Sequence, residues 1–249
     1  MEALLTSNST PGVKPPPQGH NKGVTVRTVI DRGPKGKKVV AFSVDWPGWS
    51  RGAKTDELAL ETLETDRDRY RPIASLAGMA TEFDKAGPLE VVEDKIGTPS
   101  VDFWGISFSP AAIEPEPLSE ADLERGITLL RAAWEFFDDV AARVSPEMAK
   151  GPRGGGRDRD QIIRHVTRVE SLDFASNVGI RLEDHEGLSG KTLRDFREDY
   201  VAAIRAYNAG EVEKRMRTRN LPFVIRHTAF HSLDHAWEME DKDLTGVSA

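Results

Sequence analysis

The 249-residue sequence contains no cysteine. This absence excludes disulfide bridges, thiolate nucleophiles, zinc-finger knuckles and iron–sulfur clusters, and it favours a cytoplasmic location. Long apolar runs are also missing, because the best of them, residues 127–137, is interrupted by charge and is far shorter than the roughly 18 residues of a membrane span. The chain does not begin with a basic and then apolar leader, so we predict neither a secretory signal nor a membrane partner.

Positive charge is in short supply. Acidic side chains outnumber basic ones by 41 to 34, and the formal net charge is −7. A chain with this balance lacks the basic field that phosphate backbones attract, so a nucleic-acid partner is not favoured. Hydrophobic residues make up 38% of the sequence, which is enough for a buried core, and the length corresponds to one or two domains.

The first half of the chain has the pattern of a small α+β domain. Residues 1–22 are rich in proline, glycine and small polar residues, which predicts a flexible tail. A helix is expected from Thr55 or Asp56 to about Pro72. Period-two alternation and β-branched residues predict four strands, at 23–30, 38–46, 88–97 and 101–110. We therefore expect a domain over 23–112, in which one helix covers a small, mostly antiparallel sheet.

The second half is predicted to be all-α. Pro115 and Pro117 forbid a helix, and the acidic residues around them favour a solvated linker over 113–118. Beyond the linker, apolar residues recur at three-to-four spacing, and Ser119 is placed as a helix N-cap. The helices are predicted at 119–144, 160–179, 189–208 and 221–243. Four helices within 119–249 are the composition of an up-down four-helix bundle.

Histidine is the residue type with the clearest chemical pattern. His227, His231 and His235 follow one another at steps of four, so that neighbours lie on one face of the last helix, about 6 Å apart along its axis. Two imidazoles one turn apart can share a divalent metal ion. His165, between apolar positions of another helix, is the best source of a third ligand. A histidine on an apolar face can also be a hydrogen-bonded core residue, and spacing alone leaves both possibilities open.

Two carboxylates lie near these histidines in the sequence. Glu238 is three residues after His235, and Glu170 is five residues after His165. Either could orient a ligand imidazole, as carboxylates commonly do around metals. The alternative is that both are solvated charges on the helix surface.

Two segments, 157–179 (RDRDQIIRHVTRVESLDFASNVG) and 226–241 (RHTAFHSLDHAWEMED), resemble helices of DinB-like four-helix bundles. The resemblance extends over about residues 117–243 and implies a divalent metal, zinc or nickel, bound by His165, His231 and His235. His227 remains an alternative ligand, or a residue that bonds to one. The resemblance further implies an open metal position for water or a thiol, hence a metal-dependent transferase, isomerase or hydrolase that acts on a small molecule, and a possible homodimer.

The segment KVVAFSVDWPGWSRGAKTDELALETLETDRDRY is similar to the HicB-like antitoxin fold. Over residues 24–75, the positions that match are Pro47, Gly48, Gly52, Thr55, Glu57 and Ala59. Trp49 departs from the small residue usual after the Pro-Gly turn, and a helical region replaces the usual DNA-binding partner. This similarity implies a second hypothesis, a non-catalytic binding or regulatory protein of antitoxin-like type in which any metal site is structural.

Overall fold

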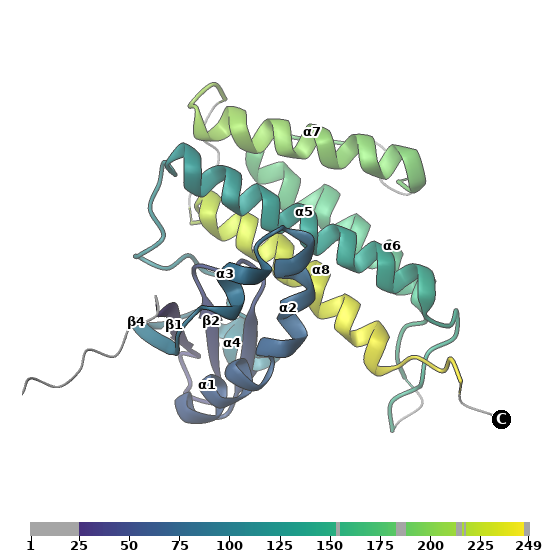
Figure 1. The fold of residues 1–249 in the computed structure, drawn as a ribbon, viewed down its shortest axis with the longest axis horizontal. Coiled ribbons are helices and arrows are strands. Elements are labelled where there is room, and N and C mark those ends of the chain that lie inside the picture. Colours follow the sequence, from purple (N-terminus) through teal and green to yellow (C-terminus); the bar gives the residue numbers. More distant parts are fainter. Residues whose placement is uncertain (1–24, 153–154, 183–187, 213–215, 217, 247–249) are drawn as a thin grey trace, which may run out of the picture.

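The computed structural model describes residues 25–152, 155–182, 188–212, 216 and 218–246, and the predicted tail over 1–22 lies outside them. The fold is α+β: a four-stranded sheet lies beside a group of long helices (Figure 1). Within the described residues, no helix combines the length and the apolar character needed to cross a membrane.

The sheet is mixed. Its strands are β1 (Val26–Arg32), β2 (Val39–Ser43), β3 (Ser50–Ala53) and β4 (Leu89–Ile96), in the order β3-β2-β1-β4. The β1–β2 and β2–β3 pairs are antiparallel and the β1–β4 pair is parallel, so the sheet is mostly antiparallel, as predicted. Every residue of β2 is buried, because the sheet is covered on both faces. The third strand, β3, was not predicted, since its sequence SRGA contains no β-branched or aromatic residue.

The predicted strand over 101–110 is wrong, because Val101 to Trp104 belong to helix α4 (Pro99–Trp104). Proline at the first position of a helix has the required φ and loses no hydrogen bond, which outweighs the strand-like pattern that follows it. The predicted helix ending near Pro72 is also wrong in extent. It is two helices, α1 (Asp56–Thr65) and α2 (Arg67–Leu76), with Pro72 inside the second, and a short α3 (Ala80–Asp84) follows them.

The described residues of the second half form four further α-helices, α5 (Glu120–Arg143), α6 (Arg159–Val169), α7 (Gly190–Asn208) and α8 (Leu221–Asp241). Ser119 caps α5 as predicted, its hydroxyl accepting a hydrogen bond from the Asp122 amide at 3.1 Å. The helix predicted over 160–179 stops being α-helical after Val169. A π-helical turn (Glu170–Phe174) and a 3-10 turn (Ala175–Val178) complete it.

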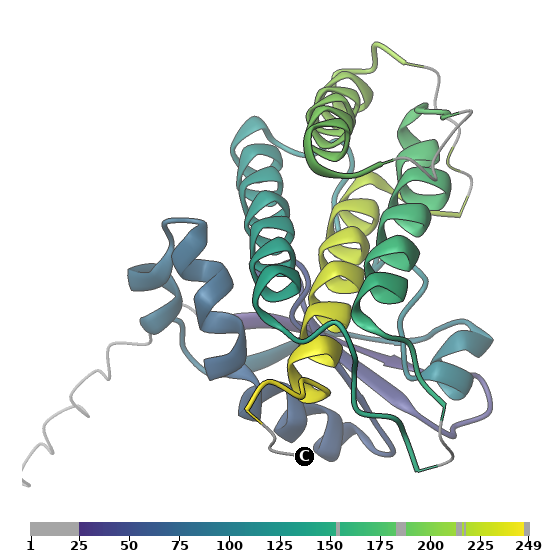
Figure 2. The same ribbon diagram turned by 90° about the vertical axis from the view of Figure 1, so that its right-hand side faces the viewer.

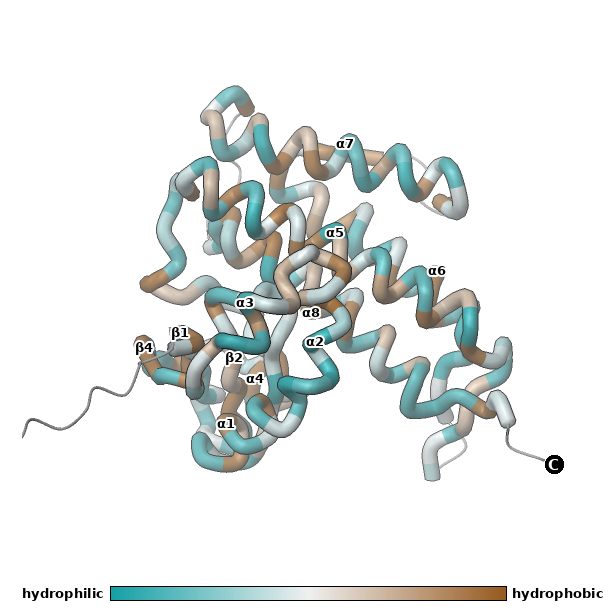
Figure 3. Tube along the Cα trace, viewed as in Figure 1, coloured by the Kyte–Doolittle hydropathy of each residue, from teal (hydrophilic) through white to brown (hydrophobic). Residues whose placement is uncertain are grey.

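Helix α8 is the central element. It packs against α5 and α6 and runs beside the sheet, as the two perpendicular views show (Figures 1 and 2). Hydrophilic and hydrophobic residues alternate along α7, on the outside of the helical layer (Figure 3). Most of α8 is buried, by contrast, including Arg226 and His227. One continuous apolar cluster joins Trp49 and Tyr70 of the first half to Leu130 and Leu233 of the second.

The linker is held to the helices more tightly than its composition predicts. Glu114 is 5% exposed and so departs from the expected solvated stretch, whereas Pro115 to Pro117 are exposed, as predicted. Its carboxylate accepts two hydrogen bonds from Arg226 of α8, at 2.6 and 3.2 Å. Further along, the backbone of Leu118 exchanges hydrogen bonds with the Asn208 side chain. Burial of the Glu114 carboxylate costs less free energy because Arg226 compensates its charge. The sequence alone does not show that Arg226 is the partner.

Candidate metal centre

The structure brings together three of the histidines that the spacing selects. Helix α6 buries Ile162 and Val166, and His165 lies beside them, facing α8. On α8, His231 and His235 are one turn apart on the side that faces α6. The centres of the three rings are 5.2 Å (His165–His231), 4.9 Å (His165–His235) and 4.7 Å (His231–His235) apart.

The spacing of the ring nitrogens fits a single metal ion. One nitrogen from each ring lies within 4.8 Å of the other two. A triangle with such sides has a point within about 2.8 Å of all three corners, whereas zinc–nitrogen bonds are about 2.0–2.1 Å long. Each ring therefore has to move by less than about 1 Å to bind the ion, which side-chain rotation can provide.

The electrostatics of the cluster favour neutral imidazoles. Burial, together with the neighbouring His235, lowers the pKa of His165 to about 4 and that of His231 to about 2. At neutral pH these rings keep the lone pair that a metal ligand needs. The Nδ1 atom of His231 is buried and has no hydrogen-bond partner among the described residues. Such an atom is costly unless something binds it.

His235 is oriented by a carboxylate on its own helix. Its Nδ1 atom lies 2.7 Å from Oε2 of Glu238, and Lys242 donates to the other carboxylate oxygen, Oε1. The hydrogen bond from His235, helped by that from Lys242, lowers the pKa of Glu238 to about 2, so the carboxylate only accepts. Nδ1 therefore carries a proton, and Nε2 is the nitrogen of His235 that can bind a metal.

His227 does not join the cluster. Its ring is 2% exposed and is surrounded by the rings of four phenylalanines, at centroid distances between 4.5 and 5.8 Å. Burial lowers its pKa to about 3. The four rings are those of Phe108, Phe174, Phe223 and Phe230. This imidazole therefore serves as a neutral part of the core.

Glu170 neither orients a ligand histidine nor lies on the surface, the two alternatives that the sequence leaves open. It is 1% exposed, so it is no surface charge, and its nearest charged neighbour is Arg197 of α7, with 3.5 Å between Arg197 Nε and Glu170 Oε1. Burial raises the pKa of Glu170 to about 7. Neither carboxylate oxygen has a hydrogen-bond partner among the described residues. In the described part of the chain, Glu170 forms no hydrogen bond with His165, and its charged partner is Arg197 instead.

Two neighbours of the site were missed. Lys242 is four residues after Glu238, a spacing at which opposite charges on a helix meet. The sequence therefore allows this ion pair to be predicted. Phe174 lies 5.5 Å from the ring of His231 and 5.3 Å from that of His227. Its position depends on the π-helical turn, for which the sequence offers no recognisable pattern.

Comparisons of the chain with protein-family models, curated proteins and solved structures found no match.

Proposed function

We propose that His165, His231 and His235 bind a divalent metal ion, zinc or nickel, and that the centre acts on a small molecule. The observation that carries this proposal is the convergence of three ring nitrogens from two helices within 4.8 Å. Three imidazoles are a ligand set suited to either ion, and in zinc enzymes three protein ligands leave the fourth position open. The proposal includes an up-down four-helix bundle of DinB-like type, which the packing of α5 and α6 on α8 supports.

A bound divalent ion would supply a Lewis acid that acidifies a water or thiol at its open position. The residues of the chain then have separate tasks. Glu238 holds the proton on His235 Nδ1 and fixes the direction of the ring. His231 and the half-buried His165 provide neutral donors, so the full positive charge remains for the reactant. This arrangement suits transfer, isomerisation or hydrolysis.

Metal analysis of the purified protein tests the ligand set. Protein produced in medium supplied with zinc and nickel is expected to contain about one equivalent of metal, and His231→Ala and His235→Ala to contain less than a tenth of that. The matched control is His227→Phe, which places another phenyl ring among the four phenylalanines and should keep the metal. A metal-free wild type, or metal retained by both alanine variants, would contradict the proposal.

Cobalt substitution tests whether the centre is open. The visible absorption of a protein-bound Co²⁺ ion changes when a ligand enters its coordination sphere, and a small thiol is a suitable probe. A spectral change on adding the thiol supports the small-molecule function. A bound ion whose spectrum does not respond would favour the second hypothesis, a binding or regulatory protein with a structural metal.

A further inference from the structure

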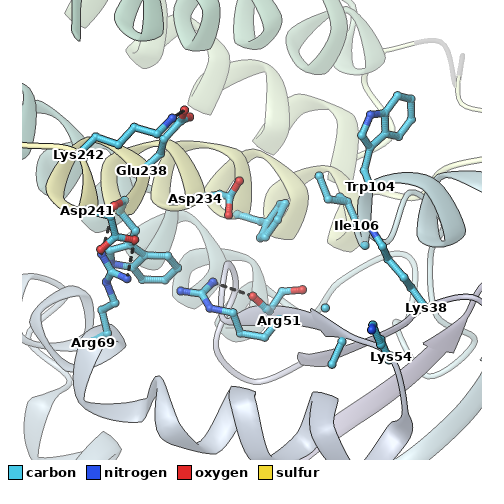
Figure 4. Close-up of a pocket in the computed structure, with 16 residues that line it drawn as sticks. Lys38, Arg51, Lys54, Arg69, Trp104, Ile106, Asp234, Glu238, Asp241 and Lys242 are labelled. Atoms are coloured by element: carbon cyan, nitrogen blue, oxygen red, sulfur yellow. Dashed lines mark hydrogen bonds and ion pairs between the residues drawn. The ribbon is translucent and has the colours of Figure 1, made fainter. Parts of the chain in front are cut away.

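A second site lies on another side of α8. A cleft of about 600 Å³ separates α8 from β3, α2 and α4 (Figure 4). Its size is within the range of small-molecule sites in proteins. Apolar side chains contribute to its walls, among them Trp104, Ile106, Phe230 and Trp237.

The shape of the cleft depends on a close approach between two backbone segments. A Cβ atom on Gly52 of β3 would lie 2.5 Å from the carbonyl oxygen of Gly105, so only glycine fits there. Gly105 itself has φ +74° and ends α4. This approach brings β3 and α4 together at one side of the cleft, with Lys38 and Lys54 beside them.

Most charged groups in the cleft already have partners. The Arg51 guanidinium lies over the Trp237 ring, with its Cζ atom 4.2 Å from the ring centroid. Arg69 bonds Asp241 at 2.6 Å. Among the described residues, the cleft residues form the ion pairs Arg51–Asp66, Arg69–Asp241, Arg69–Glu240 and Lys242–Glu238, and Glu238 also pairs with His235. These charges are neutralised within the protein and have little left to offer a ligand.

Three charges in the cleft are not neutralised by ion pairs among the described residues. Asp234, on the α8 wall, is only partly exposed; it accepts no hydrogen bond and forms no ion pair, although Arg51 and Arg69 lie near enough to attract its charge. Lys54 is exposed and likewise has no partner. Lys38 is half-buried and donates only to the Phe103 carbonyl, at 2.9 Å. In Figure 4 the two lysines lie at the same end of the cleft, and Asp234 projects from the helix above Arg51.

A partly buried carboxylate without a hydrogen bond or ion pair costs more folding free energy than a neutral asparagine of the same size would. Charges of both signs that lack a direct ion-pair partner, in one cleft, match a ligand that also carries both signs. We propose that this cleft binds a small zwitterion, with its carboxylate or phosphate held by Lys38 and Lys54 and its ammonium group held by Asp234. The apolar walls accommodate the remainder of the molecule.

This site is separate from the metal centre, although Glu238 lines the cleft and also bonds His235. The test therefore uses chelator-treated full-length protein, because amino acids also coordinate metals. The probes are leucine, phenylalanine and phosphoethanolamine, titrated by calorimetry. N-acetyl-leucine, which keeps only the negative charge, and leucine methyl ester, which keeps only the positive one, serve as single-charge analogues.

We expect at least one zwitterion to bind, and amino acids and phosphoethanolamine to reveal which anionic group is preferred. For a carboxylate ligand, both single-charge analogues should bind at least tenfold more weakly. Asp234→Asn and Lys54→Gln should each weaken binding of the preferred zwitterion at least tenfold. The control variants Asp139→Asn and Lys37→Gln, which change exposed charges outside the cleft, should stay within twofold.

The proposal is overturned if none of the three zwitterions binds. It is also overturned if Asp234→Asn binds as the wild type does, because the cleft would then recognise only an anion. Circular dichroism of each variant confirms that it is folded before its titration is compared. Because no metal is present in these titrations, a failure here leaves the metal proposal to its own test.

Discussion

His235 and Glu238 are one helical turn apart on α8, and the His235 imidazole donates from Nδ1 to the Glu238 carboxylate over 2.7 Å. Lys242, a further turn along, holds the other carboxylate oxygen. The three side chains form a chain of contacts on one face of the helix. Metal-binding proteins commonly orient their ligand histidines by such hydrogen bonds. Here the hydrogen-bonded residues are all within eight positions of one another in the sequence.

Glu238→Gln should weaken metal binding about 10- to 100-fold, because the amide no longer holds the His235 ring by a charge-assisted hydrogen bond. Competition with a coloured chelator measures the change in Kd. The control is Glu135→Gln, which alters an exposed glutamate of α5. Equal affinity in Glu238→Gln and wild type would show that the His235–Glu238 contact has no effect on binding.

The buried Glu170 predicts a pH dependence of stability. Its pKa is about 7 in the folded protein against an ordinary value of 4.5. Between these values the unfolded chain has released its proton while the folded chain retains it, so the free energy of unfolding falls as pH rises from about 4.5 to 7. The loss is of order 3 kcal/mol at full separation of the two pKa values.

Glu170→Gln should remove that part of the pH dependence, because the amide does not ionise. Urea unfolding of the variant and the wild type at pH 5 and pH 8 measures it. The stability gained by the variant relative to wild type is expected to be larger at pH 8 than at pH 5. The same difference at both pH values would mean that Glu170 ionises normally in the folded protein.

Gly48 is a site where two effects of a methyl group can be separated. Its φ is +94°, and an added Cβ would lie 2.8 Å from Leu233 Cδ1 and 3.2 Å from the Ala229 carbonyl carbon, both on α8. Gly36 also has a positive φ, +63°, but open space around it. Gly36→Ala should cost about 1 kcal/mol from the backbone alone, and Gly48→Ala about 3 kcal/mol because of the added contact with α8. Thermal unfolding compares them, and equal costs would refute close packing of this turn on α8.

The buried pair between Glu114 and Arg226 attaches the linker to α8. Glu114→Ala leaves the Arg226 guanidinium buried without its partner, which should cost about 3–5 kcal/mol in the free energy of unfolding. Replacing both, as Glu114→Leu with Arg226→Met, should recover much of that loss, but not all, because Glu114 also accepts from the Ala111 amide at 2.7 Å. Urea unfolding tests the order. A cost below about 1 kcal/mol for Glu114→Ala would show that the pair is dispensable.

Local patterns predicted much of the helical half. The Ser119 cap, the long amphipathic stretch after it and the four-residue steps of histidine on α8 depend on near neighbours in the sequence, and such signals survive folding. The position of α4 was missed because the alternating aromatic residues after Pro99 resemble a strand. Only the proline favours a helix there, and it was outweighed.

Non-local partners account for the rest. The steps from His227 to His231 and from His231 to His235 are identical, so spacing cannot tell which pair faces α6; the rings around His227 decide it. The burial of Glu170 depends on Arg197, which arrives from α7. The position of Asp234 in a cleft, without an ion-pair partner, depends on β3 and α4, which line the same cleft. Charges that are adjacent in space but distant in sequence leave no periodic signal.

Helix α8 has a consequence for how this chain can change. It holds Glu114 through Arg226, packs against the Gly48 turn through Ala229, presents two histidines to α6 and places Asp234 in the cleft. One residue inserted within Thr228–Phe230 would rotate everything after it by about 100° relative to Arg226. Such an insertion would dislocate the histidines and the cleft wall in a single event. Both halves of the protein thus depend on contacts with α8. Either half could be joined to a different partner only if that partner supplied a helix with the same contact residues.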